Sequence, residues 1–214
     1  MTVPLAERLR TATRELHRSV ERAGLMPALL RGQLPRADYL LLLRNLHALY
    51  EALESGLARH ADHPQLAPLQ LPALARAGAL AADLDALHGA GWAPALPLCA
   101  ATRAYVDRLR LLADRRPPLL AAHAYVRYLG DLNGGQVLAR LVGQGLQLAP
   151  GQGVAFYDFG AAEQVAACSR AFRAGLDGIA PDEAAAQALV DEACDAFVRH
   201  RELFEQLQRP TAGH

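Results

Sequence analysis

The amino-acid sequence predicts an all-α protein with a single domain. Alanine and leucine dominate, while β-branched and aromatic residues are scarce, and this balance favours helices over sheets. Apolar residues recur at helical spacing along the chain, and proline and glycine separate the periodic segments. With 214 residues, of which 52% are hydrophobic, the chain can bury one full core. We therefore expect a bundle of about seven to eight helices.

The first half of the chain contains four of these expected helices. The first starts at Thr2 and Pro4 and ends before Gly24, and the second opens at Pro35 and continues to about residue 57. A weaker helix over about 72–88 follows a proline-rich connector, and the next covers about 97–114 and stops before Pro117 and Pro118. In each, the apolar residues form one stripe, as a helix packed against a core requires.

The second half of the chain contains the three remaining helices. A long helix is expected over about 119–148, followed by an aromatic loop at 156–160 and a helix over about 161–176. The last covers about 181–207, and Asp182 and Glu183 place negative charge at its start, as the helix dipole favours. We expect one domain over residues 1–208 and a short flexible tail over 209–214.

Charge and cysteine usage exclude several classes of protein. Arginines and acidic residues balance at 22 each, which argues against a nucleic-acid binder. The chain has no lysine, so any anion site must use arginine. Cys99, Cys168 and Cys194 are far apart and form no CxxC pair, which indicates a reducing compartment. With no signal peptide and no membrane span in the sequence, we expect a cytoplasmic protein.

Three glycines interrupt the long helix: Gly130, Gly134 and Gly135. Each costs roughly 1 kcal/mol relative to alanine in a helix interior. Two interpretations account for this cost: a kinked helix that another helix crosses closely, or a backbone that lies over a planar ligand. The polar residues among the glycines, Arg127 and Asp131 in particular, favour the second interpretation.

His17 is the histidine best placed to bind a ligand. It lies at the edge of the apolar stripe of the first helix, with Arg10, Arg14 and Glu21 on the same flank. Such a flank could bind a flat, apolar, acidic cofactor, and Glu21 could fix the tautomer of the imidazole. The alternative is that these are ordinary solvated charges. The sequence contains no GxxxxGK[ST] phosphate loop, no GxSxG elbow and no Glu-x-x-His di-iron motif. We therefore expect no flavin, and no metal other than one that such a flat cofactor carries.

The segment from Tyr128 to Leu138, YLGDLNGGQVL, is similar to the signature of the heme oxygenases, which produce biliverdin, with Asn133 where that family usually has serine. The segments around His17, Tyr50, His123, Tyr157 and Phe197 also resemble the family, so the resemblance covers almost the whole chain. It implies a heme-oxygenase-like bundle with a glycine-kinked distal helix.

The resemblance implies roles for individual residues. His17 would be the axial ligand of the heme iron, and a neutral imidazole suits that role. Asp131 would deliver protons through ordered water. The catalytic set implied in this way is Asp131, Arg127, Gly130, Tyr50 and Tyr105. The heme-binding set is Arg10, Arg14, His17, Glu21, Tyr125, Gly130, Gly134, Gly135, Arg173 and Phe197. Within this set, Arg10, Arg14, Tyr125 and Arg173 would bind the heme propionates. His200 stands where the family can have an asparagine.

The expected function is the oxidative opening of heme b, which is both substrate and cofactor, at a meso carbon to biliverdin, CO and Fe²⁺. O2 is consumed, and electrons come from an external donor such as ferredoxin or a ferredoxin or flavodoxin reductase. A biliverdin acceptor such as a phytochrome could take the product. Two alternatives stay open: a heme carrier or sensor on the same fold, and a helical interaction domain without a cofactor. The sequence leaves open the position of cleavage, the donor, the oligomeric state and the choice between iron acquisition and bilin supply.

Overall fold

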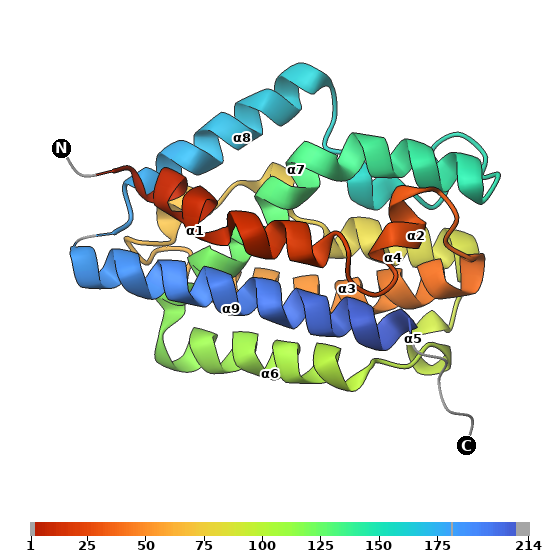
Figure 1. Ribbon diagram of the computed structural model, residues 1–214, viewed down its shortest axis with the longest axis horizontal. Helices are drawn as coiled ribbons and strands as arrows, with labels where there is room; N and C mark the ends of the chain where they lie inside the picture. The colour runs from red at the N-terminus through yellow and green to blue at the C-terminus, as the bar shows by residue number, and fades with distance from the viewer. Residues whose placement is uncertain (1–2, 181, 209–214) are drawn as a thin grey trace.

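The structure, a computed structural model, describes residues 3–180 and 182–208, and the regular structure in these residues is entirely helical. Figure 1 shows the arrangement of the helices. The α-helices are α1 (Leu5–Val20), α2 (Met26–Leu30), α3 (Arg36–Arg59), α4 (Ala77–His88), α5 (Trp92–Ala95), α6 (Ala100–Arg115), α7 (Leu120–Gly145), α8 (Ala162–Asp177) and α9 (Glu183–Gln208). Four short 3-10 helices join them: η1 (Ala67–Leu69), η2 (Pro72–Leu74), η3 (Pro117–Leu119) and η4 (Ala155–Tyr157). The all-α prediction is confirmed.

The seven expected helices are all present, and the described residues contain two more that were not expected. These are the short helices α2 and α5, which lie where Pro27 and Pro94 were interpreted as breaks. Proline is compatible with the first turn of a helix, so it did not exclude either one. The weaker helix begins at Ala77 instead of at Pro72, because the chain makes a 3-10 turn first. The expected starts at Thr2 and Pro181 and the expected tail over 209–214 lie outside the described residues.

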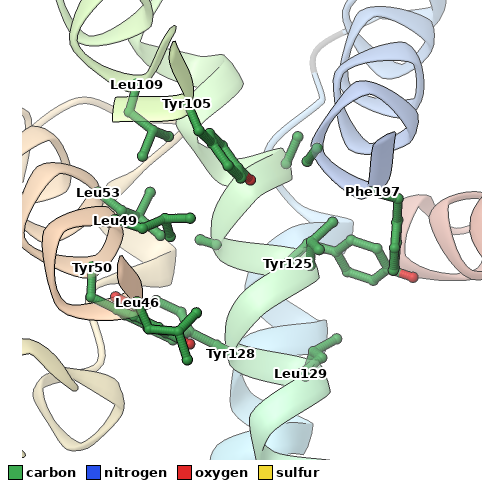
Figure 2. Packing of buried hydrophobic residues seen from close by; sticks show 14 of the residues in the cluster. Leu46, Leu49, Tyr50, Leu53, Tyr105, Leu109, Tyr125, Tyr128, Leu129 and Phe197 are labelled. Atoms are coloured by element: carbon green, nitrogen blue, oxygen red, sulfur yellow. The ribbon is translucent and has the colours of Figure 1, made fainter. Parts of the chain in front are cut away.

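The helices pack around a core of leucine and aromatic side chains. In Figure 1, α1 lies along α9, and these two helices, which come from opposite ends of the sequence, make the most extensive helix pair in the molecule. Helix α3 packs against both α4 and α6. Figure 2 shows side chains of α3 and α6, among them Leu49, Tyr50 and Tyr105, around the early part of α7. No helix in the described part of the chain is long and apolar enough to cross a membrane.

Helix α7 is continuous in its hydrogen bonding across Gly130, Gly134 and Gly135. In Figure 1 its first part rises steeply and its later part follows the long axis of the molecule. A kink located at these glycines stays a prediction. The helix contacts α9, α8, α3, α2 and η4, so residues on its different faces meet most of the molecule.

A close backbone approach fixes the end of α1 against α9. Gly24 has a φ of +51°, and a Cβ on it would lie 1.9 Å from the carbonyl oxygen of Phe204. The next residue, Leu25, donates its backbone N–H to that same carbonyl oxygen at 3.3 Å. Glycine is required here for both its left-handed conformation and its lack of a side chain. The contact holds the final turn of α1, which includes His17, beside α9.

Candidate active site

A cavity of about 420 Å³ opens between α1, α2, α3, α7 and α9. Apolar side chains supply most of its lining, and the polar ones are few, as is usual for small-molecule sites. The polar lining residues are His17, Glu21, Arg127, Asp131, Asn133 and His200. Gly130 and Gly134 also line the cavity. Four residues named from the sequence as central, His17, Gly130, Asp131 and Gly134, thus meet in one place.

His17 projects from the last turn of α1, and its side chain is 54% exposed. The nearer oxygen of Glu21 lies 3.6 Å from Nδ1, one helical turn further along. The ring of Phe197 meets the imidazole edge-on, with 5.9 Å between the centroids. Glu21 therefore faces Nδ1 of His17, and this leaves Nε2 as the ring nitrogen available to an incoming ligand.

The three glycines of α7 do not share one role. A Cβ built at Gly130 or Gly134 would meet no atom of the described chain within 4 Å outside its own helix turn, because both residues face the cavity. Gly135 lies away from the cavity, and a Cβ there would be 3.2 Å from the carbonyl oxygen of Tyr157 in η4. Gly130 and Gly134 thus border open space in the cavity, while Gly135 packs closely against η4.

Asp131 is the centre of a buried polar cluster on the cavity wall. Its Oδ1 accepts a hydrogen bond from Nη2 of Arg127 at 2.7 Å, and its Oδ2 accepts a short one from the hydroxyl of Tyr50. Arg127 also donates from Nε to that hydroxyl oxygen at 3.0 Å, which closes a triangle between α3 and α7. All three side chains are largely buried, so the cluster has one fixed geometry.

Burial sets the acid–base character of this cluster. It raises the pKa of Asp131 well above its ordinary value and lowers that of Arg127 to about 10. The guanidinium beside Oδ1 favours the charged form of the carboxyl group and so acts against burial. Opposing effects of this kind produce a carboxyl group that can both hold and release a proton.

A second buried network lies behind the cavity, and Tyr105 belongs to it. Its hydroxyl lies 2.8 Å from Nδ1 of His123, whose Nε2 lies 3.0 Å from Oε1 of Glu192. Arg108 donates to Glu192 from Nε at 3.0 Å. Burial opposes ionisation of Glu192, but the hydrogen bonds from His123 and Arg108 hold its pKa at about 2. Tyr105 therefore contacts this network and does not line the cavity itself.

The sequence did not predict that His123, Glu192 and Arg108 form a network with Tyr105. The four residues lie on three helices, α6, α7 and α9, so no spacing along the chain connects them. One signal was available: His123 interrupts a buried run from Leu120 to Val126, and Glu192 lies beside the buried Ala193. A charged or polar residue at a buried position needs a partner, and this predicts a network without naming its members.

The residues expected to hold propionates lie outside the cavity lining. Tyr125 is buried, and its hydroxyl lies 3.3 Å from that of Thr13 on α1. Arg173 and Arg10 are close enough to Tyr125 for their charges to favour its ionised form, although burial raises its pKa overall. Arg14 lies at the surface, with Nε 3.8 Å from Glu15. Figure 2 shows Tyr125 beside Phe197, which does line the cavity.

Comparisons with known proteins show the family to which the chain belongs. The family model described as heme oxygenase matches residues 3–206. Heme oxygenase 1 of Synechocystis sp. is 38% identical over 208 residues, which are 97% of this chain and 86% of that protein. The crystal structure of a cyanobacterial heme oxygenase-1 from Synechocystis in complex with heme superposes with a TM-score of 0.90 at 37% identity, covering 96% of this chain and 93% of the other.

A second solved structure extends the comparison. Heme oxygenase-2 from Synechocystis, in complex with heme and NO, superposes with a TM-score of 0.92 at 36% identity and covers 96% of this chain and 85% of the other. The family match over residues 3–206 includes the long glycine-containing helix α7. The chain belongs to the heme oxygenase family.

Proposed function

We propose that this protein binds heme in the cavity between α1 and α7 and opens it oxidatively to biliverdin, CO and Fe²⁺. The observation that carries the proposal is that His17, the bare wall of Gly130 and Gly134, and the buried Asp131 line one cavity. An axial ligand, space for a planar ring and a proton donor are the three requirements of such a reaction.

The residues present fit heme. Nε2 of His17 is free of its carboxylate neighbour, and imidazole is a common axial ligand of heme iron. Side chains at Gly130 and Gly134 would fill the space that a macrocycle needs. Val126, Leu138 and Phe197 provide an apolar lining for its faces and edge. The positive charges of Arg10 and Arg173 act on Tyr125, which lies just outside the cavity lining, and we assign the propionates to these three residues.

When bound, heme supplies the site where O2 is reduced and is itself the group that is oxidised. The protein's part is to place donors and protons. Because Gly130 and Gly134 have no side chains, the cavity wall there consists of backbone and would leave space for a planar ring and for water. Asp131, fixed by Arg127 and Tyr50, would hold a proton at its carboxyl oxygens on the wall of that space and would pass it to a water there.

The electrons come from an external donor, such as ferredoxin or a ferredoxin or flavodoxin reductase. The sequence carries no flavin motif, so a partner must bring reducing equivalents to the heme edge. A reducing, cytoplasmic location fits the three cysteines, which form no disulfide with one another in the structure.

The test is a spectroscopic turnover assay. The protein is mixed with hemin, ascorbate or a ferredoxin system is added under O2, and spectra are recorded. We expect a Soret band that decays as bile-pigment absorbance rises and iron is released. A protein with no Soret band would contradict heme binding altogether. A stable Soret band with no bile pigment and no iron release would instead identify a heme carrier.

A further inference from the structure

His200 on α9 lines the same cavity and is not used by the function proposed above. Its side chain is 1% exposed. Nδ1 lies 2.8 Å from the backbone carbonyl oxygen of Ala196, one turn earlier on the helix. Nε2 is buried and has no hydrogen-bond partner among the described residues. A buried polar atom without a protein partner, in a side chain that lines a cavity, points to a ligand or a water in that cavity.

Nδ1 also lies 3.5 Å from the hydroxyl of Tyr105, but its nearer partner, the carbonyl oxygen of Ala196, determines the tautomer of the His200 ring. A carbonyl oxygen can only accept a hydrogen bond, so Nδ1 carries the hydrogen. In the neutral imidazole, Nε2 is then an acceptor with a free lone pair. The ring meets that of Tyr105 edge-on, with centroids 5.1 Å apart and planes at 87°, which holds the ring plane in place.

The groups around His200 keep its ring neutral. Burial is the main effect that lowers its pKa well below the ordinary value, and the charge of Arg127 and the neighbouring His123 lower it further. Tyr105 from α6 and Phe204 from α9 complete its surroundings. At neutral pH the cavity therefore meets a hydrogen-bond acceptor here, in addition to the carboxyl group of Asp131.

We propose that His200 is a positioning residue that holds a water molecule in the cavity by accepting a hydrogen bond at Nε2. That water has a second O–H, which it can donate to Asp131 or to an oxygen of a bound ligand. His200 and Asp131 both line this cavity of about 420 Å³. Only the role of this water in turnover rests on the proposed function, and its position does not.

The first test uses the heme-free protein and requires no activity. In ¹⁵N-histidine NMR, we expect His200 to be neutral, with hydrogen on Nδ1 and with Nε2 accepting a hydrogen bond. It should remain so down to about pH 5, well below the ordinary histidine pKa of about 6.5. A hydrogen on Nε2, or protonation of the ring near that ordinary pKa, would overturn the proposal.

The second test compares His200→Gln, which keeps an acceptor, with His200→Leu, which removes it. Crystal structures should show an ordered water at Nε2 in the natural protein and at the amide oxygen of the glutamine variant, and none there in the leucine variant. A water at the same place in His200→Leu, or none at Nε2 in the natural protein, would refute the assignment. His47→Leu is the matched control. Nδ1 of His47 is also buried without a hydrogen-bond partner among the described residues, but His47 does not line the cavity.

The third test measures the consequence for the heme-loaded enzyme. We expect His200→Leu to lower turnover about 10-fold or more, which is the loss typical when a hydrogen-bonding group behind the reacting groups of a metal site is removed. Heme affinity and melting temperature should be unchanged. His200→Gln should recover most of this loss. A glutamine variant no better than the leucine variant would contradict the role. If the natural protein turned over no heme, the proposed function would fail, while the NMR and crystallographic tests of His200 would still stand.

Discussion

At the scale of single residues, Asp131 is the group on which the proposed chemistry depends. Two donors from two helices hold its two oxygens, so the carboxyl group has one orientation toward the cavity. The sequence indicated Asp131 and Arg127 because they lie one turn apart on a helix. The resemblance placed Tyr50, 81 residues earlier, in the same catalytic set, but its hydrogen bond to Asp131 exists only after α3 and α7 pack.

We predict that Asp131→Asn binds heme normally and loses most of its biliverdin formation. The amide can still accept from Tyr50 but cannot exchange a proton as a carboxyl group does, so a loss of about 100-fold or more is expected. Soret titration gives the affinity, and bile-pigment absorbance gives the yield. Asp131→Ala is the harsher variant, because it leaves Arg127 buried without its partner at a cost of about 3–5 kcal/mol. A normal yield from the folded asparagine variant would refute the proton-delivery role.

A second residue-scale prediction concerns His17. Since its imidazole is the proposed axial ligand and is half exposed, His17→Ala should abolish turnover while leaving the fold intact. Imidazole added to the solution should restore part of the activity by entering the space that the side chain vacates. The change in the Soret spectrum, measured with and without imidazole, checks this. Full activity of the alanine variant without imidazole would exclude His17 as the ligand.

At the scale of elements, α7 shows how far a sequence pattern can be interpreted. Its length, its apolar periodicity and the cost of its glycines were all visible in the sequence. The separate roles of Gly134 and Gly135 were not, because adjacent residues on a helix point about 100° apart and only packing shows what each one meets. Gly134 faces the cavity, while Gly135 meets η4, a segment about 20 residues later.

This difference gives a paired prediction for Gly134→Ala and Gly135→Ala. In the heme-free protein, Gly134→Ala should raise the free energy of unfolding by up to about 1 kcal/mol, because alanine is the better helix former and has open space there. The same methyl group should weaken heme binding about 10-fold, equivalent to about 1.4 kcal/mol. Denaturant unfolding and Soret titration measure the two effects.

Gly135→Ala serves as the control for the neighbouring position. Its methyl group would lie 3.2 Å from the backbone oxygen of Tyr157, so η4 must shift slightly and the stability gain should be lost. Heme affinity should change less than in Gly134→Ala. Equal losses of heme affinity in the two variants would contradict the assignment of only one of these two neighbouring glycines to the cavity wall.

At the scale of the whole molecule, the fold was more predictable than the site. Each long helix has an apolar stripe and a proline or glycine near its ends, and these are local signals. The short helices α2 and α5 lack both a stripe and length, and their prolines resembled breaks. The network from Tyr105 to Glu192 joins three helices, and its one local signal, a polar residue within an apolar run, does not identify the partners, so only the assembled bundle could show them.

Burial of histidines in the assembled bundle predicts how stability depends on pH. His123 and His200 have folded-state pKa values below the ordinary value of 6.5, chiefly because burial disfavours the charged ring. The unfolded chain therefore binds more protons than the folded one as the pH falls below about 6.5, and stability is lost in that direction. Each such histidine contributes a slope of up to about 1.4 kcal/mol per pH unit.

Urea unfolding of the heme-free protein between pH 7 and pH 5 measures this slope. His200→Gln removes one of these histidines, so its stability should fall less steeply with decreasing pH than that of the natural protein. An equal slope in His200→Gln and the natural protein would show that His200 is not held neutral by the fold.

The pairing of α1 with α9 has a consequence for how the cavity is assembled. His17 on α1 and Phe197 and His200 on α9 line the same cavity, although about 180 residues of sequence lie between them. A chain cut after α8 would keep the proposed axial histidine and lose the helix that α1 packs against. We therefore expect such a fragment to bind heme poorly, because two opposite walls of the site come from distant parts of the chain.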